Sequence, residues 1–127
     1  MRAATAARPA AAADGELVTK AALRAAGRLG LSNRSLSRII GLSEATVSRM
    51  GSGSFVLAPG DKAFELALMF LRLFRSLDAI VGGDDAAARG WVASDNKALG
   101  GVPVELMHSL SGLVNVVAYL DSRRALV

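Results

Sequence analysis

Two short amphipathic segments separated by a glycine constrain the fold of this chain more than any other feature. Residues 33–40 and 44–50 carry apolar side chains at helical spacing, and Gly41 between them can adopt the positive φ that a tight turn requires. Ser32 and Ser43 precede the two segments, where a serine hydroxyl caps a helix. A helix-turn-helix is therefore predicted, with small or apolar residues where its helices meet: Leu36, Ser37, Ile40, Gly41, Leu42, Val47 and Met50.

The rest of the chain has the composition of helices rather than strands. Alanine and leucine dominate it, it contains three prolines, and no run of alternating β-branched residues is long enough to propose a sheet. Capping residues precede several apolar-periodic segments, and glycines follow some of them. We predict an all-α fold, with further helices over residues 17–29, 61–79, 86–92, 104–109 and 113–123.

The predicted helix over residues 61–79 is apolar on two faces, one with Phe64 and Leu71 and the other with Phe70 and Leu77. A single small neighbour cannot cover both stripes. We favour a central core helix. The alternative is that one stripe forms a homodimer interface, and both interpretations can hold in a small protein that shares its core across a two-fold axis.

Charge is distributed unevenly along the chain. Residues 17–60 contain six basic residues and one acidic residue, a balance of +5, whereas residues 61–127 contain seven basic and eight acidic residues, a balance of −1. A positive module can bind a polyanion, although a charged face is often simply solvated. We divide the chain into a disordered alanine-rich tail at 1–16, a helix-turn-helix module at 17–60 and a second helical module at 61–127.

The sequence also argues against several classes of protein. It has no cysteine, so disulfides and thiolate metal sites are excluded. Its longest later apolar run, residues 66–71, is far shorter than the roughly 20 residues that cross a bilayer, so we expect a cytoplasmic protein without membrane contact. His108 is the only histidine, and no nucleophile motif or phosphate-binding glycine loop occurs. We expect no enzymatic activity, no metal and no cofactor.

The second helix of the predicted motif has the side chains of a DNA-reading helix. Such a helix places its N-terminal residues at base edges in the major groove. Glu44 argues against this, because phosphate repels a carboxylate, and the alternative is a helical hairpin that does not bind DNA. The candidate DNA contacts are Arg49 for a base or phosphate, Ser43, Thr46 and Ser48 for phosphate oxygens, and Arg34 and Arg38 for the backbone.

Two groups of residues resemble a known family. Residues 42–49 resemble the core of Xre-type helix-turn-helix regulators, although Met50 stands where a tryptophan often follows. The second half resembles the signature of the Xre/MbcA/ParS antitoxins: a tryptophan, an Asn-x-x-Leu-Gly-Gly turn, a proline-led helix and a glycine before the final helix. The residues that carry this second resemblance are Trp91, Val92, Asn96, Leu99, Gly100, Gly101, Pro103, Leu106, Met107 and Gly112.

The resemblance implies an antitoxin with an Xre-like helix-turn-helix module, followed by a small helical module for dimerisation and toxin binding. Its partner would be a RES-type toxin that consumes NAD or ADP-ribosylates a protein, and the second module would block the toxin's active site. The first module would bind operator DNA and repress the operon. A homodimer within a toxin–antitoxin heterotetramer is expected.

The candidate toxin contacts lie in the second module. Two consecutive glycines in the turn at 96–101 suit a sharp bend or a close approach of another chain. We expect Trp91 to fill the core of this module, with an interface anchor as the alternative. Other side chains recur at four-residue spacing on the last helix, and the two terminal arginines are plausible plugs for an acidic cleft. The candidates are Asn96, Gly100, Gly101, Asn115, Tyr119, Arg123 and Arg124.

Two alternatives to the antitoxin remain at this point. The first is a dimeric helix-turn-helix transcription regulator without a toxin partner, whose second module only dimerises. The second and weaker one is a segregation-site adaptor, suggested only by names used within the family. A tight complex with the product of an adjacent gene favours the antitoxin, and DNA binding without a protein partner favours the regulator.

Overall fold

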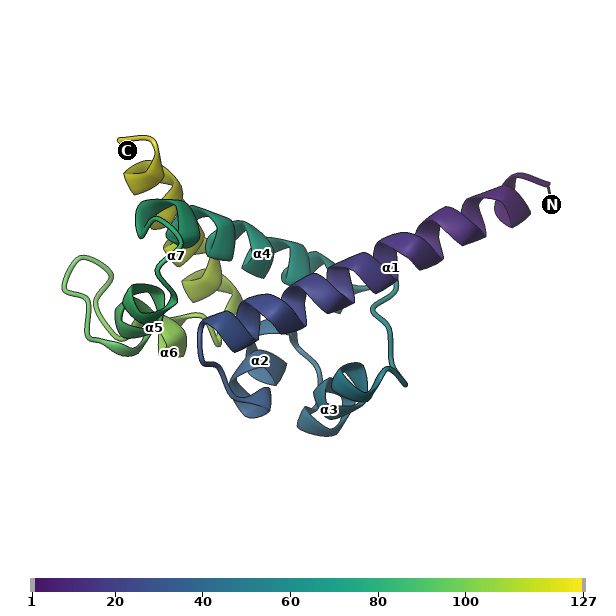
Figure 1. Cartoon of the computed structure of the whole chain (residues 1–127), viewed down its shortest axis with the longest axis horizontal. Helices are drawn as coiled ribbons and strands as arrows, with labels where there is room; N and C mark the ends of the chain where they lie inside the picture. Colours follow the sequence, from purple (N-terminus) through teal and green to yellow (C-terminus); the bar gives the residue numbers. More distant parts are fainter. Residues whose placement is uncertain (1, 127) are drawn as a thin grey trace.

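The computed structural model describes the backbone of residues 2–126 and the side chains of residues 12–126. The described chain is all-helical, apart from an isolated β-bridge between Asn96 and Gly101, so the predicted all-α fold is confirmed. The helices are α1 (Arg2–Arg28), α2 (Asn33–Ile40), α3 (Glu44–Ser52), α4 (Lys62–Ile80), α5 (Asp85–Ala93), α6 (Pro103–Leu106) and α7 (Leu110–Arg124) (Figure 1).

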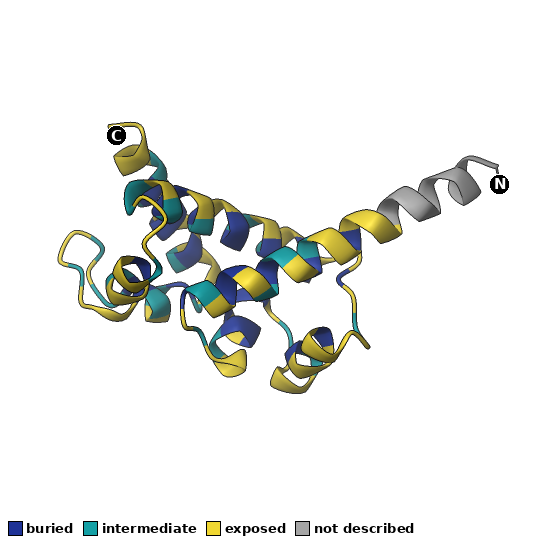
Figure 2. Cartoon of the chain, in the orientation of Figure 1, coloured by how far each residue is buried: buried dark blue, intermediate teal, exposed yellow. Residues whose placement is uncertain are grey.

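Helix α4 occupies the centre of the molecule. It packs against α1, α2, α5 and α7, while α2 and α3 pack against each other below α1 (Figure 1). Phe70, Leu73 and Leu77 of α4 are at most 1% exposed, and only Leu68 among its large apolar residues stays well exposed, at 42%. The interpretation of this segment as the central core helix is therefore confirmed. Figure 2 shows the buried positions on the faces that the helices turn toward one another.

A single hydrophobic core joins the two halves of the sequence. Its fully buried side chains come from the helix-turn-helix and from the last helices alike, so neither half encloses a core of its own. The largest of them are Phe70, Leu29, Leu36, Ile40, Leu73, Leu77, Met107, Leu113, Leu120, Val47, Val92 and Val116.

The start of α1 differs from the prediction. The helix begins at Arg2 rather than near residue 17, and Met1 lies outside the described residues. The separation of residues 1–16 as a disordered tail stays a prediction. Alanine is the strongest helix former, which favours helix in this segment. Gly15 also packs closely, because a Cβ there would lie 2.3 Å from the carbonyl oxygen of Leu57. The Thr19 hydroxyl completes the contact: it donates to the Gly15 carbonyl (2.7 Å) and accepts from the Leu57 amide (2.9 Å).

The two C-terminal helices also have different limits from those predicted. Helix α6 ends at Leu106 rather than at 109, and α7 begins at Leu110 rather than at 113. Ser109 caps α7, since its hydroxyl accepts a hydrogen bond of 3.1 Å from the amide of Gly112. Gly112 therefore lies inside the first turn of α7 and is not the break that the sequence suggested. It is needed there, because a Cβ would lie 1.8 Å from the Leu106 carbonyl oxygen.

Candidate functional site

The helix-turn-helix forms as the local sequence predicts. The hydroxyls of Ser32 and Ser43 accept hydrogen bonds from the amides of Ser35 and Thr46, which starts α2 and α3. Gly41 ends α2 with φ 74°, and its amide donates to the Ser37 carbonyl at 2.9 Å. The predicted contact positions are buried, except that Leu42 is half-buried in the turn and Gly41 is exposed: Leu36, Ser37, Ile40, Val47 and Met50.

The candidate DNA contacts lie on the outer side of this motif. Arg34 and Arg38 are exposed on α2, and Ser48 is exposed on α3. On α3 the half-buried Thr46 accepts a hydrogen bond of 3.0 Å from Arg49, which holds the guanidinium along the helix surface. Among the described side chains, none of these arginines forms an ion pair, so their charges remain available to a phosphate.

Ser43 has less freedom than the sequence suggested. Its hydroxyl accepts from the Thr46 amide at 3.1 Å and shares a hydrogen bond of 2.8 Å with the Thr46 hydroxyl. These bonds give both residues a structural role at the start of α3, with Ser43 as the helix cap and Thr46 as its partner. DNA contact by Ser43 or Thr46 stays a prediction, and it requires a hydroxyl that is already hydrogen-bonded within α3 to bind a phosphate oxygen as well.

The loop at residues 96–101 is a closed turn built around Asn96. Its amide donates to the Gly101 carbonyl at 2.9 Å, and its carbonyl accepts from the amide of Gly100 at 2.9 Å. The Asn96 side chain accepts from the Leu99 amide at 3.1 Å, and Gly100 has φ 80°. Asn96 and Gly100 thus have structural reasons for their identity. A role for them and for Gly101 in binding a partner stays a prediction.

The last helix brings two of its predicted contacts together with a third residue. The rings of Trp91 (α5) and Tyr119 (α7) stack with centroids 6.3 Å apart, and the guanidinium of Arg123 lies 5.6 Å from the Tyr119 centroid. Trp91 is only half-buried, so it packs against the core without being enclosed by it. Asn115 and Arg124 are exposed on the same helix, and no hydrogen bond of the described residues joins this row to the loop at 96–101.

The end of α7 is anchored to α4 by Asp121. Its carboxylate accepts from the buried Ser76 hydroxyl at 2.7 Å and pairs with Arg72 at 2.5 Å. The hydrogen bond from Ser76 and the charge of Arg72 lower the pKa of Asp121 below its usual value. The carboxylate is therefore ionised at neutral pH and holds the helix turn that precedes Arg123 and Arg124.

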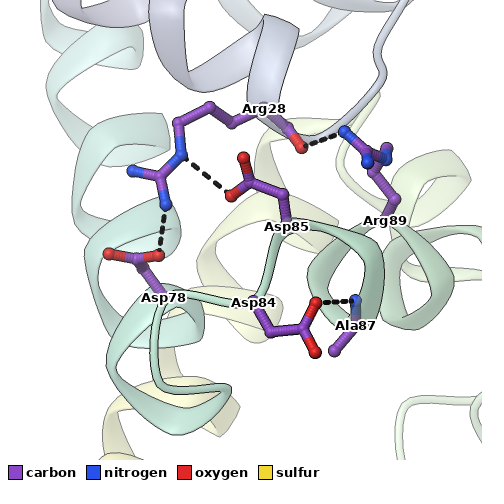
Figure 3. Close-up of polar contacts among 6 residues, drawn as sticks. All are labelled: Arg28, Asp78, Asp84, Asp85, Ala87 and Arg89. Atoms are coloured by element: carbon purple, nitrogen blue, oxygen red, sulfur yellow. Dashed lines mark hydrogen bonds and ion pairs between the residues drawn. The ribbon is translucent and has the colours of Figure 1, made fainter.

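Sequence reasoning missed an ion-pair cluster at the C-terminal end of α1. Arg28 donates to Asp78 of α4 at 2.7 Å and to Asp85 of α5 at 2.9 Å (Figure 3). Its guanidinium also lies 4.8 Å from the centroid of the Phe74 ring. Arg89 donates to the carbonyl of Arg28 at 3.3 Å. Hydrogen bonding to Asp85 is the main reason why the pKa of Arg28 is raised. No local sequence pattern predicts this cluster, because its other members lie 50 or more positions from Arg28 along the chain.

A groove of about 370 Å³ separates the helix-turn-helix from α5 and α6. At its edge the Ser35 hydroxyl and Nε2 of His108 share a hydrogen bond of 2.8 Å. Burial lowers the pKa of His108, the charge of Arg38 lowers it further, and Glu105 opposes both. No three histidine, aspartate or glutamate side chains of the described chain are grouped to hold a metal, and no helix in this range is long and apolar enough to cross a membrane.

Comparison with protein families places both halves of the chain. Residues 7–72, more than half of the chain, match the model of the antitoxin Xre-like helix-turn-helix domain. Residues 76–125 match the antitoxin Xre/MbcA/ParS C-terminal toxin-binding domain. The two matches meet within α4, whereas the division at residues 60 and 61 stays a prediction. The search of the curated proteins found no match.

Proposed function

Because the chain belongs to the Xre/MbcA/ParS antitoxin family, we propose that it neutralises a RES-type toxin, an enzyme that consumes NAD or uses it to ADP-ribosylate a protein. In this proposal the toxin-binding half covers the toxin's NAD-binding cleft. The helix-turn-helix binds operator DNA and represses the operon that encodes both proteins. The antitoxin itself has no enzymatic activity and needs no cofactor.

The observation that carries the proposal is the pair of arginines at the end of α7. Arg123 and Arg124 lie within the toxin-binding match, are exposed, and form no ion pair with any described side chain. A guanidinium can pair bidentately with carboxylates that line an active site. Asp121 fixes the preceding turn to α4, so the arginines project from a helix that is already positioned.

The remaining candidate contacts extend this surface. Tyr119 and Asn115 lie on α7, about one and about two helical turns before Arg123, respectively. In the proposal, the loop at 96–101 contributes shape rather than charge, because its glycines allow a partner's backbone to come close. The toxin-binding match supports the antitoxin over a regulator that lacks a toxin partner.

The proposed assembly contains two antitoxins and two toxins. A helix-turn-helix reads two half-sites about 34 Å apart when two copies are held together. Each chain provides one such motif, with Arg34, Arg38 and Arg49 exposed, so a homodimer within a heterotetramer suits a two-fold operator. Light scattering on the purified complex measures this stoichiometry, and a 1:1 complex that binds operator DNA with full affinity contradicts it.

Co-expression with the cognate toxin tests inhibition. We expect the full chain to restore growth and cellular NAD, and a chain truncated after Asp121 to lose this rescue. The double variant Arg123→Ala, Arg124→Ala should also lose it, whereas Arg75→Ala, which removes an exposed arginine of α4, should not. Full rescue by the truncated chain contradicts the plug. A purified complex that consumes NAD as fast as the free toxin contradicts the proposed function itself.

A further inference from the structure

Trp91, Tyr119 and Arg123 form one layered group on the surface of the toxin-binding half. Tyr119 contacts both of the others, with its ring centroid 6.3 Å from that of Trp91 and 5.6 Å from the guanidinium carbon of Arg123. The planes of the two rings differ by 19°, so the rings are stacked. Both rings are half-buried, and Arg123 is exposed. We call this group the aromatic–arginine stack.

Composition makes this location unusual. The chain contains one tryptophan and one tyrosine, and the fold brings them into contact with each other although they are 28 positions apart. Tryptophan, tyrosine and arginine are the residue types most enriched among the side chains that dominate binding energy at protein interfaces. The fully buried side chains of the core include Phe70 and come otherwise from leucine, isoleucine, valine and methionine, whereas Trp91 and Tyr119 stay half-buried.

The polar ends of the stack are not used within the chain. Among the described residues, no hydrogen bond joins the indole of Trp91 or the hydroxyl of Tyr119 to a partner, and no carboxylate pairs with Arg123. Arg28 and Arg72, in contrast, form ion pairs with aspartates of the same chain. The face of Tyr119 restrains the Arg123 guanidinium, so less side-chain entropy is lost when a carboxylate binds it.

We propose that the aromatic–arginine stack is the anchor of the toxin interface, with the rings covering an apolar rim and Arg123 entering an acidic pocket on the toxin. This inference rests on the proposed function for the existence of the complex, and it names the residues that supply most of its binding energy. It adds Trp91 to the contacts and gives Tyr119 the role of holding Arg123.

A protein partner suits this surface better than a nucleic acid does. Aromatic platforms also stack on single-stranded bases, but such sites lie in positively charged grooves. Residues 76–125 contain four basic and six acidic residues, a net charge of −2, which repels a phosphate backbone. The positive charge of the molecule lies instead in the half that carries the helix-turn-helix.

Affinity measurements on the full chain and its cognate toxin test the anchor. We expect Arg123→Gln to weaken the complex at least tenfold, and Tyr119→Leu, which keeps an apolar side chain on α7, to do the same. Arg123→Lys should lose most of the affinity as well, because an ammonium does not reproduce the planar stack. The matched control Arg75→Gln should stay within twofold. Unchanged circular dichroism of each variant separates lost binding from lost folding.

The single tryptophan allows a second readout that a purely structural role does not move. Replacing it biosynthetically with 5-fluorotryptophan gives one ¹⁹F resonance, from position 91. We expect this resonance to shift when saturating toxin is added and to stay in place when operator duplex or a single-stranded oligonucleotide is added. A toxin complex that leaves both the resonance and the affinity of Arg123→Gln unchanged overturns the anchor while the proposed function stands. A shift caused by the oligonucleotide alone assigns the stack to nucleic acid instead.

Discussion

His108 lies between the two halves of the chain, where its Nε2 shares a hydrogen bond of 2.8 Å with the Ser35 hydroxyl of α2. Burial and the nearby charge of Arg38 lower the pKa of His108, while Glu105 of α6 acts in the opposite direction. Since the folded pKa lies below the unfolded value, the unfolded chain takes up its proton first as the pH falls. The stability that neutral His108 contributes is complete above its usual pKa of 6.5 and declines as the pH falls through the lowered folded pKa.

This linkage predicts a stability loss in mild acid that depends on one residue. When the pH is lowered from about 7.5 to about 5, we expect the urea concentration at half-unfolding to decrease for the wild type. It should decrease less for His108→Gln, whose side chain does not titrate. Asp121 does not contribute in this pH range. Because its pKa is lowered, the stability that its carboxylate provides is lost only below pH 3.8, its usual pKa. An equal fall in both proteins contradicts the prediction.

Gly112 carries a different residue-scale constraint, since its role is steric. A Cβ at this position would lie 1.8 Å from the carbonyl oxygen of Leu106, which is backbone and cannot rotate away. We expect Gly112→Ala to lower the free energy of unfolding by about 3 kcal/mol, at the upper end of overpacking effects. The control Gly27→Ala also lies in a helix but has no atom near its new Cβ, and it should stabilise by about 0.5–1 kcal/mol. Chemical denaturation of both variants measures the contrast.

At the scale of elements, the sequence predicts a helix limit correctly where residues next to that limit determine it. Helices α2 and α3 were predicted with their caps, because Ser32, Ser43 and Gly41 act on backbone groups within a few residues of themselves. The start of α1 and the place of Gly112 were missed, because Gly15 and Gly112 meet carbonyls of Leu57 and Leu106 that only the folded chain brings near. A glycine in a sequence can serve a positive φ or a close contact with another backbone segment, and the sequence alone does not distinguish the two.

The same distinction applies to the candidate site. The helical row on α7 follows from spacing, so the sequence predicts Tyr119 and Arg123 on one face, where the structure has them in contact. The stacking of Tyr119 on Trp91 joins α7 to α5 across the turn and the short helix between them, and no periodicity encodes it. Sequence alone therefore placed Trp91 in the core, whereas the structure leaves it half-buried beside Tyr119.

The helix-turn-helix as an element yields a prediction about salt. If Arg34 and Arg38 contact phosphates, each substitution by glutamine should weaken operator and scrambled duplexes alike and reduce the slope of log affinity against log salt by about 1. Arg49→Gln, at the reading helix, should lower the preference for the operator. Fluorescence anisotropy over a salt series measures these effects, with Arg75→Gln as the control. A slope that Arg34→Gln and Arg38→Gln leave unchanged removes them from the interface.

At the scale of the whole molecule, the two family matches do not correspond to two independently packed units. Helix α4 is shared between them, and its buried side chains contribute to one core that also contains residues of α2, α3 and α7. The Arg28 cluster adds a polar connection, since it links α1 to α4 and α5 (Figure 3). Small domains with one core usually unfold in a single cooperative transition. A substitution that destabilises the helix-turn-helix half should therefore also lower the unfolding midpoint of the toxin-binding half.

Trp91 reports this coupling directly, because it is the only tryptophan and lies in α5, far along the chain from α3. Val47→Ala removes buried methyl groups from α3 and should destabilise by about 1–3 kcal/mol. We expect the unfolding midpoint seen by Trp91 fluorescence to fall together with the midpoint seen by circular dichroism. Val114→Ala, at an α7 position that is 42% exposed, should move neither by much. If Val47→Ala leaves the tryptophan transition in place, the halves unfold separately and the shared core does not couple them.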